Sequence, residues 1–143
     1  MDFIVRSHSD SIIMMDYHRM AKCLITISKD FTIKIWKLNT GHIVQAYEFR
    51  CIDEQVLSLR CFNNSPNFIC GFESGALRVF NIDQSAVICE LDPHKLQVND
   101  IQISLDDKYV ATSDNQGTIQ IFDQNLEFNR SIESIHFLLK SAP

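Results

Sequence analysis

Short segments in which polar and apolar residues alternate recur along the whole chain. In residues 32–36, for example, Thr32 and Lys34 alternate with Ile33 and Ile35 before Trp36 closes the segment. A period of two places successive side chains on opposite faces, as in a half-buried β-strand. The pattern predicts strands at 11–17, 22–28, 32–37, 43–49, 55–61, 67–72, 76–81, 86–91, 97–103, 108–113, 118–123 and 126–132. No window of ten or more residues favours an amphipathic helix, so we expect an all-β fold.

The predicted strands form three copies of one unit. Residues 22–36 align with residues 108–122 without a gap, and the middle copy ends at Phe80. The aromatic residues that close the copies, Trp36, Phe80 and Phe122, are 44 and then 42 residues apart. Five further residues recur between the first and third copies: Lys22, Thr26, Thr32, Ile33 and Ile35 reappear as Lys108, Thr112, Thr118, Ile119 and Ile121. A repeat of 40–45 residues is typical of a four-stranded propeller blade.

The copies predict the domain organisation. We expect one repeat array over 1–143, with a first blade at about 8–49, a second at about 52–91 and a third at about 94–132. Residues 1–7 resemble the outer strand of a preceding blade, and residues 133–143 a tail or the start of a following one. A closed propeller has four to eight blades, so three form a partial or open propeller with unpaired edges. We therefore expect further sequence or neighbouring chains to complete it.

A polar pattern in the first copy resembles the WD40-repeat β-propeller family. His8 is followed by Ser28-Lys29-Asp30, and Trp36 stands six residues after the aspartate. The resemblance implies a hydrogen-bonded network of His8, Ser28, Asp30 and Trp36 inside the blade, where donors offset the burial of the carboxylate. It also implies a protein-interaction scaffold rather than an enzyme.

The other two copies depart from this pattern. The third copy keeps His94 but has Asp114 in place of the serine, Gln116 in place of the aspartate and Phe122 in place of the tryptophan. The second copy has no such residues, and carries instead Ile52, Phe72, Ser74 and Phe80. We therefore expect both of these blades to hold by apolar packing.

A narrower resemblance comes from residues 68–80, together with Ser28-Lys29-Asp30 and Trp36. This stretch is similar to the centriolar and ciliary WD-repeat-containing protein 90 family. Members of that family are long multi-propeller proteins that associate with the microtubule walls of centrioles and axonemes. The resemblance implies tubulin or other microtubule-associated proteins as partners. It also implies a cytoplasmic location at the cytoskeleton, in the cilium axoneme or centriole.

Two other binding roles are open at this point. The blades can be a regulatory or substrate-recognition module of a larger enzyme complex, for example a ubiquitin-ligase adaptor. Reading of phosphopeptides needs clustered arginines. The arginines of this chain are dispersed: Arg6, Arg19, Arg50, Arg60, Arg78 and Arg130. Their dispersal counts against that mode of binding.

Charge and composition count against several other classes of function. The net charge of −5 and the lack of a basic cluster disfavour nucleic acid and anionic membranes as partners. No apolar run approaches the roughly 20 residues of a membrane span. The five cysteines form no CxxC motif, which favours reduced, half-buried thiols.

We expect no catalytic, metal or cofactor site. His8, Asp30 and Ser28 are the residue types of a catalytic triad, but no glycine-flanked nucleophile turn is present. The spacings of His8 with Asp10 and Asp16, and of His94 with Asp100, match no metal-ligand pattern. The glycines are scattered one per turn, so no loop can cradle a phosphate.

Phe31 is a candidate for partner contact. Gly75 and Gly117 occupy the equivalent positions, so Phe31 places a large ring in a tight turn. An exposed aromatic side chain often anchors an interface. The alternative is a turn residue packed against its own blade.

Overall fold

Eleven antiparallel strands in the described residues form three separate sheets. The computed structural model describes residues 5–39, 42–51 and 53–123. The first sheet holds β1 (Ile12–His18), β2 (Cys23–Ser28), β3 (Thr32–Asn39) and β4 (His42–Arg50). The second holds β5 (Val56–Cys61), β6 (Asn67–Phe72), β7 (Leu77–Asn81) and β8 (Ala86–Leu91). The third holds β9 (Val98–Ile103), β10 (Tyr109–Asp114) and β11 (Ile119–Asp123).

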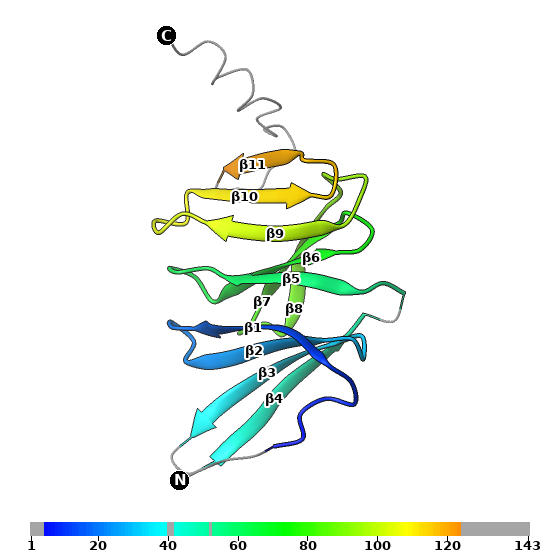
Figure 1. Ribbon diagram of the computed structural model, residues 1–143. Helices are drawn as coiled ribbons and strands as arrows, with labels where there is room; N and C mark the ends of the chain where they lie inside the picture. The colour runs from blue at the N-terminus through cyan, green and yellow to red at the C-terminus, as the bar shows by residue number, and fades with distance from the viewer. Residues whose placement is uncertain (1–4, 40–41, 52, 124–143) are drawn as a thin grey trace.

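In each sheet the strands follow one another in chain order as an up-and-down meander, and the sheets are stacked as successive layers with β5 between β1 and β9 (Figure 1). The predicted class, all-β with three blades of an open propeller, is confirmed. The described residues contain no helix that is long and apolar enough to cross a membrane.

The observed strands lie close to those predicted, and the largest difference at one end is at β3, which continues to Asn39. The predicted strand at 126–132 and the tail at 133–143 lie outside the described residues. So do residues 1–4, which hold most of the expected outer strand of a preceding blade. Residues 5–7 belong to no strand.

The second blade is buried on both faces. In β6, Phe68 and Cys70 point into a core shared with the first blade, whereas Ile69 between them points into a core shared with the third. The first blade contributes Ile25, Ile27, Ile33 and Ile35, and the third contributes Val98, Ile101, Val110 and Phe122. Burial on both sides explains why β6 reads as an almost continuous apolar run.

Gly71 lies inside β6 and not in a turn, which corrects the expectation of one glycine per turn. A β-carbon on Gly71 would lie 2.3 Å from Ser58 Oγ and 2.6 Å from Val98 Cβ. A glycine in a strand interior often marks a close approach of another element. Here the second and third blades approach so closely that only a hydrogen atom fits.

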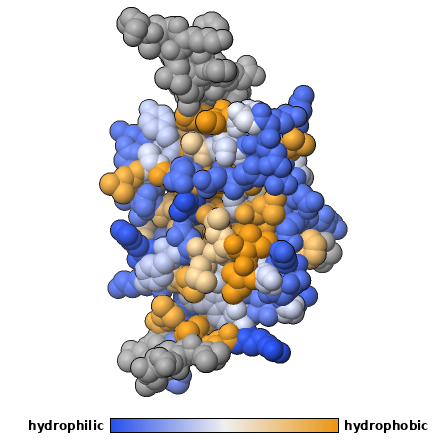
Figure 2. Space-filling model, viewed as in Figure 1, coloured by the Kyte–Doolittle hydropathy of each residue, from blue (hydrophilic) through white to orange (hydrophobic). Residues whose placement is uncertain are grey.

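The face that carries β1 and β5 has hydrophobic residues gathered near its middle, with hydrophilic residues around them (Figure 2). The turns that follow β1, β5 and β9 lie along one edge of the stack, at the left of Figure 1. The turns between β2 and β3, β6 and β7, and β10 and β11 lie along the opposite edge. The two edges therefore present different sets of turns.

Candidate functional site: polar networks inside the blades

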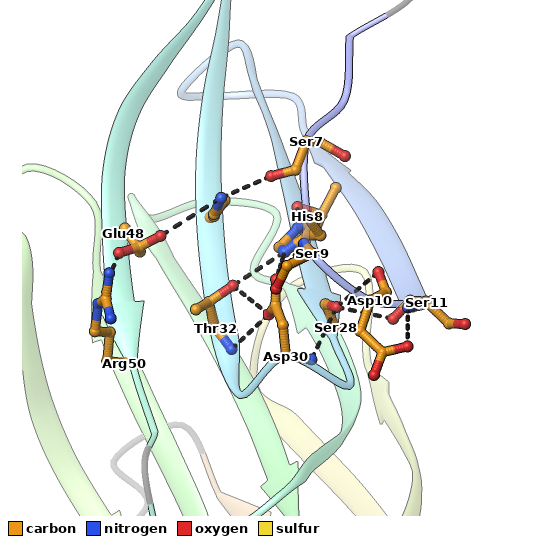
Figure 3. Close-up of polar contacts among 12 residues, drawn as sticks. Ser7, His8, Ser9, Asp10, Ser11, Ser28, Asp30, Thr32, Glu48 and Arg50 are labelled. Atoms are coloured by element: carbon orange, nitrogen blue, oxygen red, sulfur yellow. Dashed lines mark hydrogen bonds and ion pairs between the residues drawn. The ribbon is translucent and has the colours of Figure 1, made fainter.

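The first blade contains a buried polar network that joins the segment before β1 to strands β2 and β3. His8 Nδ1 lies 2.9 Å from Asp30 Oδ2, and His8 Nε2 lies 2.6 Å from Thr26 Oγ1. Trp36 Nε1 donates to the same Thr26 oxygen at 2.9 Å. Figure 3 shows His8 and Thr32 directed at the Asp30 carboxylate. The structure thus brings together three of the four predicted residues, with Thr26 as the hydroxyl that links them.

The partners determine where the protons of this network lie. Asp30 can only accept, so the proton of His8 is on Nδ1. Trp36 can only donate, so Thr26 accepts from it. The bonds form one continuous chain from Trp36 through Thr26 and His8 to Asp30.

Both oxygens of the Asp30 carboxylate are occupied. Oδ1 accepts from the Thr32 amide at 3.0 Å and from the Thr32 hydroxyl at 2.6 Å, while Oδ2 accepts from His8 and from the Ser9 amide at 3.1 Å. Burial acts to raise the pKa of Asp30, but the bonds from Thr32, His8 and Ser9 outweigh it and lower the pKa from 3.8 to about 2. Since the folded value is the lower one, the carboxylate stabilises the fold above about pH 3.8 and loses this effect as the pH falls through about 2.

Ser28, the fourth predicted residue, lies outside this chain of bonds. Its hydroxyl donates to the Ser11 carbonyl at 2.8 Å and accepts from the Asp30 amide at 3.1 Å, so it shapes the turn after β2. Both nitrogens of His8 are bonded to other groups, and the His8 side chain is only 1% exposed. The residue types of a triad are therefore present without a histidine that can activate the serine.

The third blade holds a second network, so the prediction that it relies on apolar packing is wrong. His94 Nδ1 lies 2.9 Å from Asp114 Oδ2, and His94 Nε2 lies 2.7 Å from Thr112 Oγ1. In the aligned repeats, Asp114 stands two positions earlier than Asp30 does in the first blade. It nevertheless accepts from the Thr118 amide, as Asp30 accepts from the equivalent Thr32 amide. The pKa of Asp114 is lowered because the bonds from Thr118 and His94 outweigh its burial.

The second blade replaces the network with stacked aromatic rings and an ion pair. The Phe68 and Phe80 rings are stacked with centroids 4.8 Å apart, and Phe49 of the first blade meets Phe80 edge-on. Glu54 binds both Arg78 and the hydroxyl of Ser74. Ile52, which stands where the other blades have histidine, lies outside the described residues.

His18 is a buried polar residue that the sequence pattern did not single out. It is fully buried at the end of β1, where its Nδ1 accepts from the Ala21 amide at 3.1 Å. Its Nε2 therefore donates to the Asn67 carbonyl, 3.0 Å away at the start of β6. This bond joins the first two blades. His18 does not recur in the other two copies, so the repeat pattern gave no signal for it.

The cysteines have the character of core residues. Cys23 and Cys70 are buried, and all five thiols are free. Burial raises the pKa of Cys51 to about 11 and the pKa of Cys70 well above its ordinary value. A thiol that stays protonated at neutral pH is a poor nucleophile. Within the described residues, no three His, Cys, Asp or Glu side chains are grouped as metal ligands would be.

Phe31 adopts a left-handed backbone conformation that glycine takes in the other two blades. Its φ is 65°, against 92° at Gly75 and 80° at Gly117. The side chain is 41% exposed and lies beside Asp30, Thr32 and Arg50 at the surface. A bulky residue in this region is uncommon and costs about 1–2 kcal/mol.

Replacing Phe31 with glycine is expected to change the free energy of unfolding by less than about 0.5 kcal/mol, because relief of backbone strain offsets the lost ring contacts. Phe31→Ala is the matched control, since alanine loses the ring but keeps the strain. It should be less stable than Phe31→Gly by about 1 kcal/mol in urea unfolding. Equal losses in both variants would contradict the backbone strain at this position.

The WD domain, G-beta repeat family model matches residues 3–37 and 85–123, which together make up about half of the chain. The chain belongs to the WD40 repeat family. Each matched WD40 segment carries one His–Thr–Asp network, and the segment between them coincides with most of the blade that has aromatic packing instead. WD40 repeat proteins are generally non-catalytic scaffolds that mediate protein–protein interactions.

The WD40 relatives include WD repeat-containing protein 90. The mouse (Mus musculus) protein is 30% identical over 116 residues, which is 81% of this chain and 6% of the relative. The Xenopus tropicalis protein is 29% identical over 119 residues, covering 83% of this chain and 6% of the relative. A WD repeat-containing protein 55 homolog of Dictyostelium discoideum is 22% identical over 120 residues, covering 83% of this chain and 28% of the relative. The chain therefore spans only a small part of these relatives.

Proposed function

We propose that this chain is a non-catalytic scaffold of WD40 blades that works within a larger array, in a ciliary or centriolar microtubule structure. The observation that carries the proposal is the exposure of Ile119 on the third blade. Ile119 is 56% exposed, whereas Leu77 and Ile33 at the equivalent positions are fully buried against a neighbouring blade. The position that packs against a neighbouring blade in the first two sheets is therefore uncovered in the third, where a further blade or another chain would pack.

The polar networks hold the blades in shape and take no part in chemistry. They are buried, and their donors and acceptors are matched to one another. Phe31 is the proposed contact for a protein partner, because a strained and exposed aromatic side chain is retained where glycine would fit.

The resemblance to WD repeat-containing protein 90 supports the ciliary or centriolar placement. Microtubule-wall association is what that family resemblance implies, with tubulin or another microtubule-associated protein as the partner. A cytoplasmic location at the axoneme or centriole belongs to the same proposal.

The test is an antibody raised against residues 53–123, used on the source cells. We expect an endogenous polypeptide several times heavier than 16.5 kDa and staining that coincides with tubulin at centrioles or axonemes. Staining away from microtubules, with co-purification of a catalytic subunit, would favour the regulatory or substrate-recognition module instead. A native polypeptide of about 16.5 kDa would require neighbouring chains to complete the propeller.

A further inference from the structure

A cavity of about 250 Å³ is lined by residues from the ends of β1, β5 and β9 and from the turns that follow β1 and β9. These turns lie along the edge opposite the turns between β2 and β3 and between β10 and β11 (Figure 1). All three blades contribute to the cavity. Arg19 comes from the turn after β1, Arg60 from the end of β5, and Gln102 and Leu105 from β9 and the turn that follows it. The fold thus brings together two arginines that are dispersed in the sequence.

The guanidinium groups of both arginines are available for a ligand. Arg60 Nε donates to the Ile101 carbonyl at 2.9 Å, which anchors the group and leaves its two terminal nitrogens without a bonded acceptor among the described residues. Arg19 is exposed and forms no ion pair with any residue that the structure describes.

Asp16, the one acidic residue among those that line the cavity, offsets only one of the two arginine charges. Its carboxylate accepts from the Tyr17 amide at 3.0 Å and from the Cys61 amide at 2.9 Å. Two arginines and one aspartate leave one excess positive charge in the lining.

We propose that this cavity binds a side-chain carboxylate of an acidic peptide segment on a protein partner. Guanidinium groups pair with carboxylates through charge-assisted and often bidentate hydrogen bonds. A single carboxylate matches the excess charge of the lining, whereas a phosphate group carries about −1.5 to −2 at neutral pH. The proposal rests on the scaffold function and adds the chemistry of one partner.

The rim of the cavity favours an apolar residue beside the acid. The Tyr17 side chain is 46% exposed and Leu105 is 84% exposed, and both line the cavity. An exposed leucine next to an arginine pair offers contact area that a free anion does not use. The expected ligand is therefore a segment in which glutamate or aspartate alternates with leucine-like residues.

The test titrates a short acetylated peptide of glutamate and leucine into the fluorescently labelled full chain, with the protein at about 100 nM so that self-association is suppressed. We expect a dissociation constant near 10⁻⁴ M. Arg19→Gln and Arg60→Gln should each weaken binding by about fivefold or more, and so should raising the salt concentration. Arg50→Gln is the matched control, because Arg50 is exposed on the opposite edge and should leave binding unchanged.

Binding that is equal for a peptide with glutamine in place of glutamate, or equal in Arg19→Gln and the parent chain, would overturn the proposal. Much tighter binding of a phosphoserine peptide would overturn the choice of a carboxylate. Thermal unfolding of each variant separates lost binding from lost folding, and Arg19→Gln removes no described contact. If the peptide fails while the antibody still places the protein at microtubules, the cavity assignment fails and the scaffold function stands.

Discussion

Replacing Asp30 with alanine is expected to lower the free energy of unfolding by about 2–4 kcal/mol. The change removes the acceptor for His8, for the Ser9 amide and for both donors of Thr32. The donors of His8 and Thr32 stay largely inside the blade, so they carry a desolvation cost, whereas water can replace the carboxylate at the exposed Ser9 amide. Trp36 is the only tryptophan in the chain and belongs to the network. Its fluorescence during urea unfolding therefore measures the effect directly.

Asp10→Ala is the matched control for this variant. Asp10 is exposed, and among the described residues its carboxylate accepts only from the amide of the adjacent Ser11, at 2.6 Å. Its removal should cost less than about 0.5 kcal/mol, as is usual for a surface substitution. If Asp30→Ala and Asp10→Ala are equally stable, the network contributes nothing to the blade.

Gly75→Ala is expected to be at least as damaging, with a loss of about 3 kcal/mol or more. A β-carbon on Gly75 would lie 2.1 Å from the His94 carbonyl oxygen, which is backbone and cannot rotate away. The φ of 92° adds strain for any residue with a side chain. The substitution also displaces the backbone of His94, whose side chain binds Asp114 and Thr112. Urea unfolding of the full chain measures the loss.

Gly117→Ala separates the two causes. Gly117 has a similar φ of 80°, but a β-carbon there would meet no atom within 4 Å. Its variant should therefore show only the backbone strain, about 1–2 kcal/mol. A difference of about 2 kcal/mol between the two alanine variants is expected. Equal losses would contradict a tight contact between the turn of the second blade and the loop before β9.

The polar networks show where sequence reasoning reaches its limit. His8 and Asp30 could be predicted because the spacing of a known repeat marks them. Thr26 was missed although it recurs as Thr112, because a hydroxyl in the middle of a strand has no distinctive spacing. Asp114 was assigned to the serine position and so appeared unable to bind His94. The backbone conformation of the turn decides where the carboxylate lies. An aspartate two positions earlier in the repeat, Asp114, can therefore bind the histidine of its blade as Asp30 does.

The sequence by itself determined the strands that lie within the described residues. Those features depend on the period of two along each segment and on the 44- and 42-residue repeat, which are local properties of the chain. Only the tertiary structure decided three features. Val98 packs directly against Gly71, the His18 side chain binds the Asn67 carbonyl, and Arg19 and Arg60 line the same cavity. These contacts join different blades, so they depend on how the sheets stack, and no pattern within one repeat carries that information.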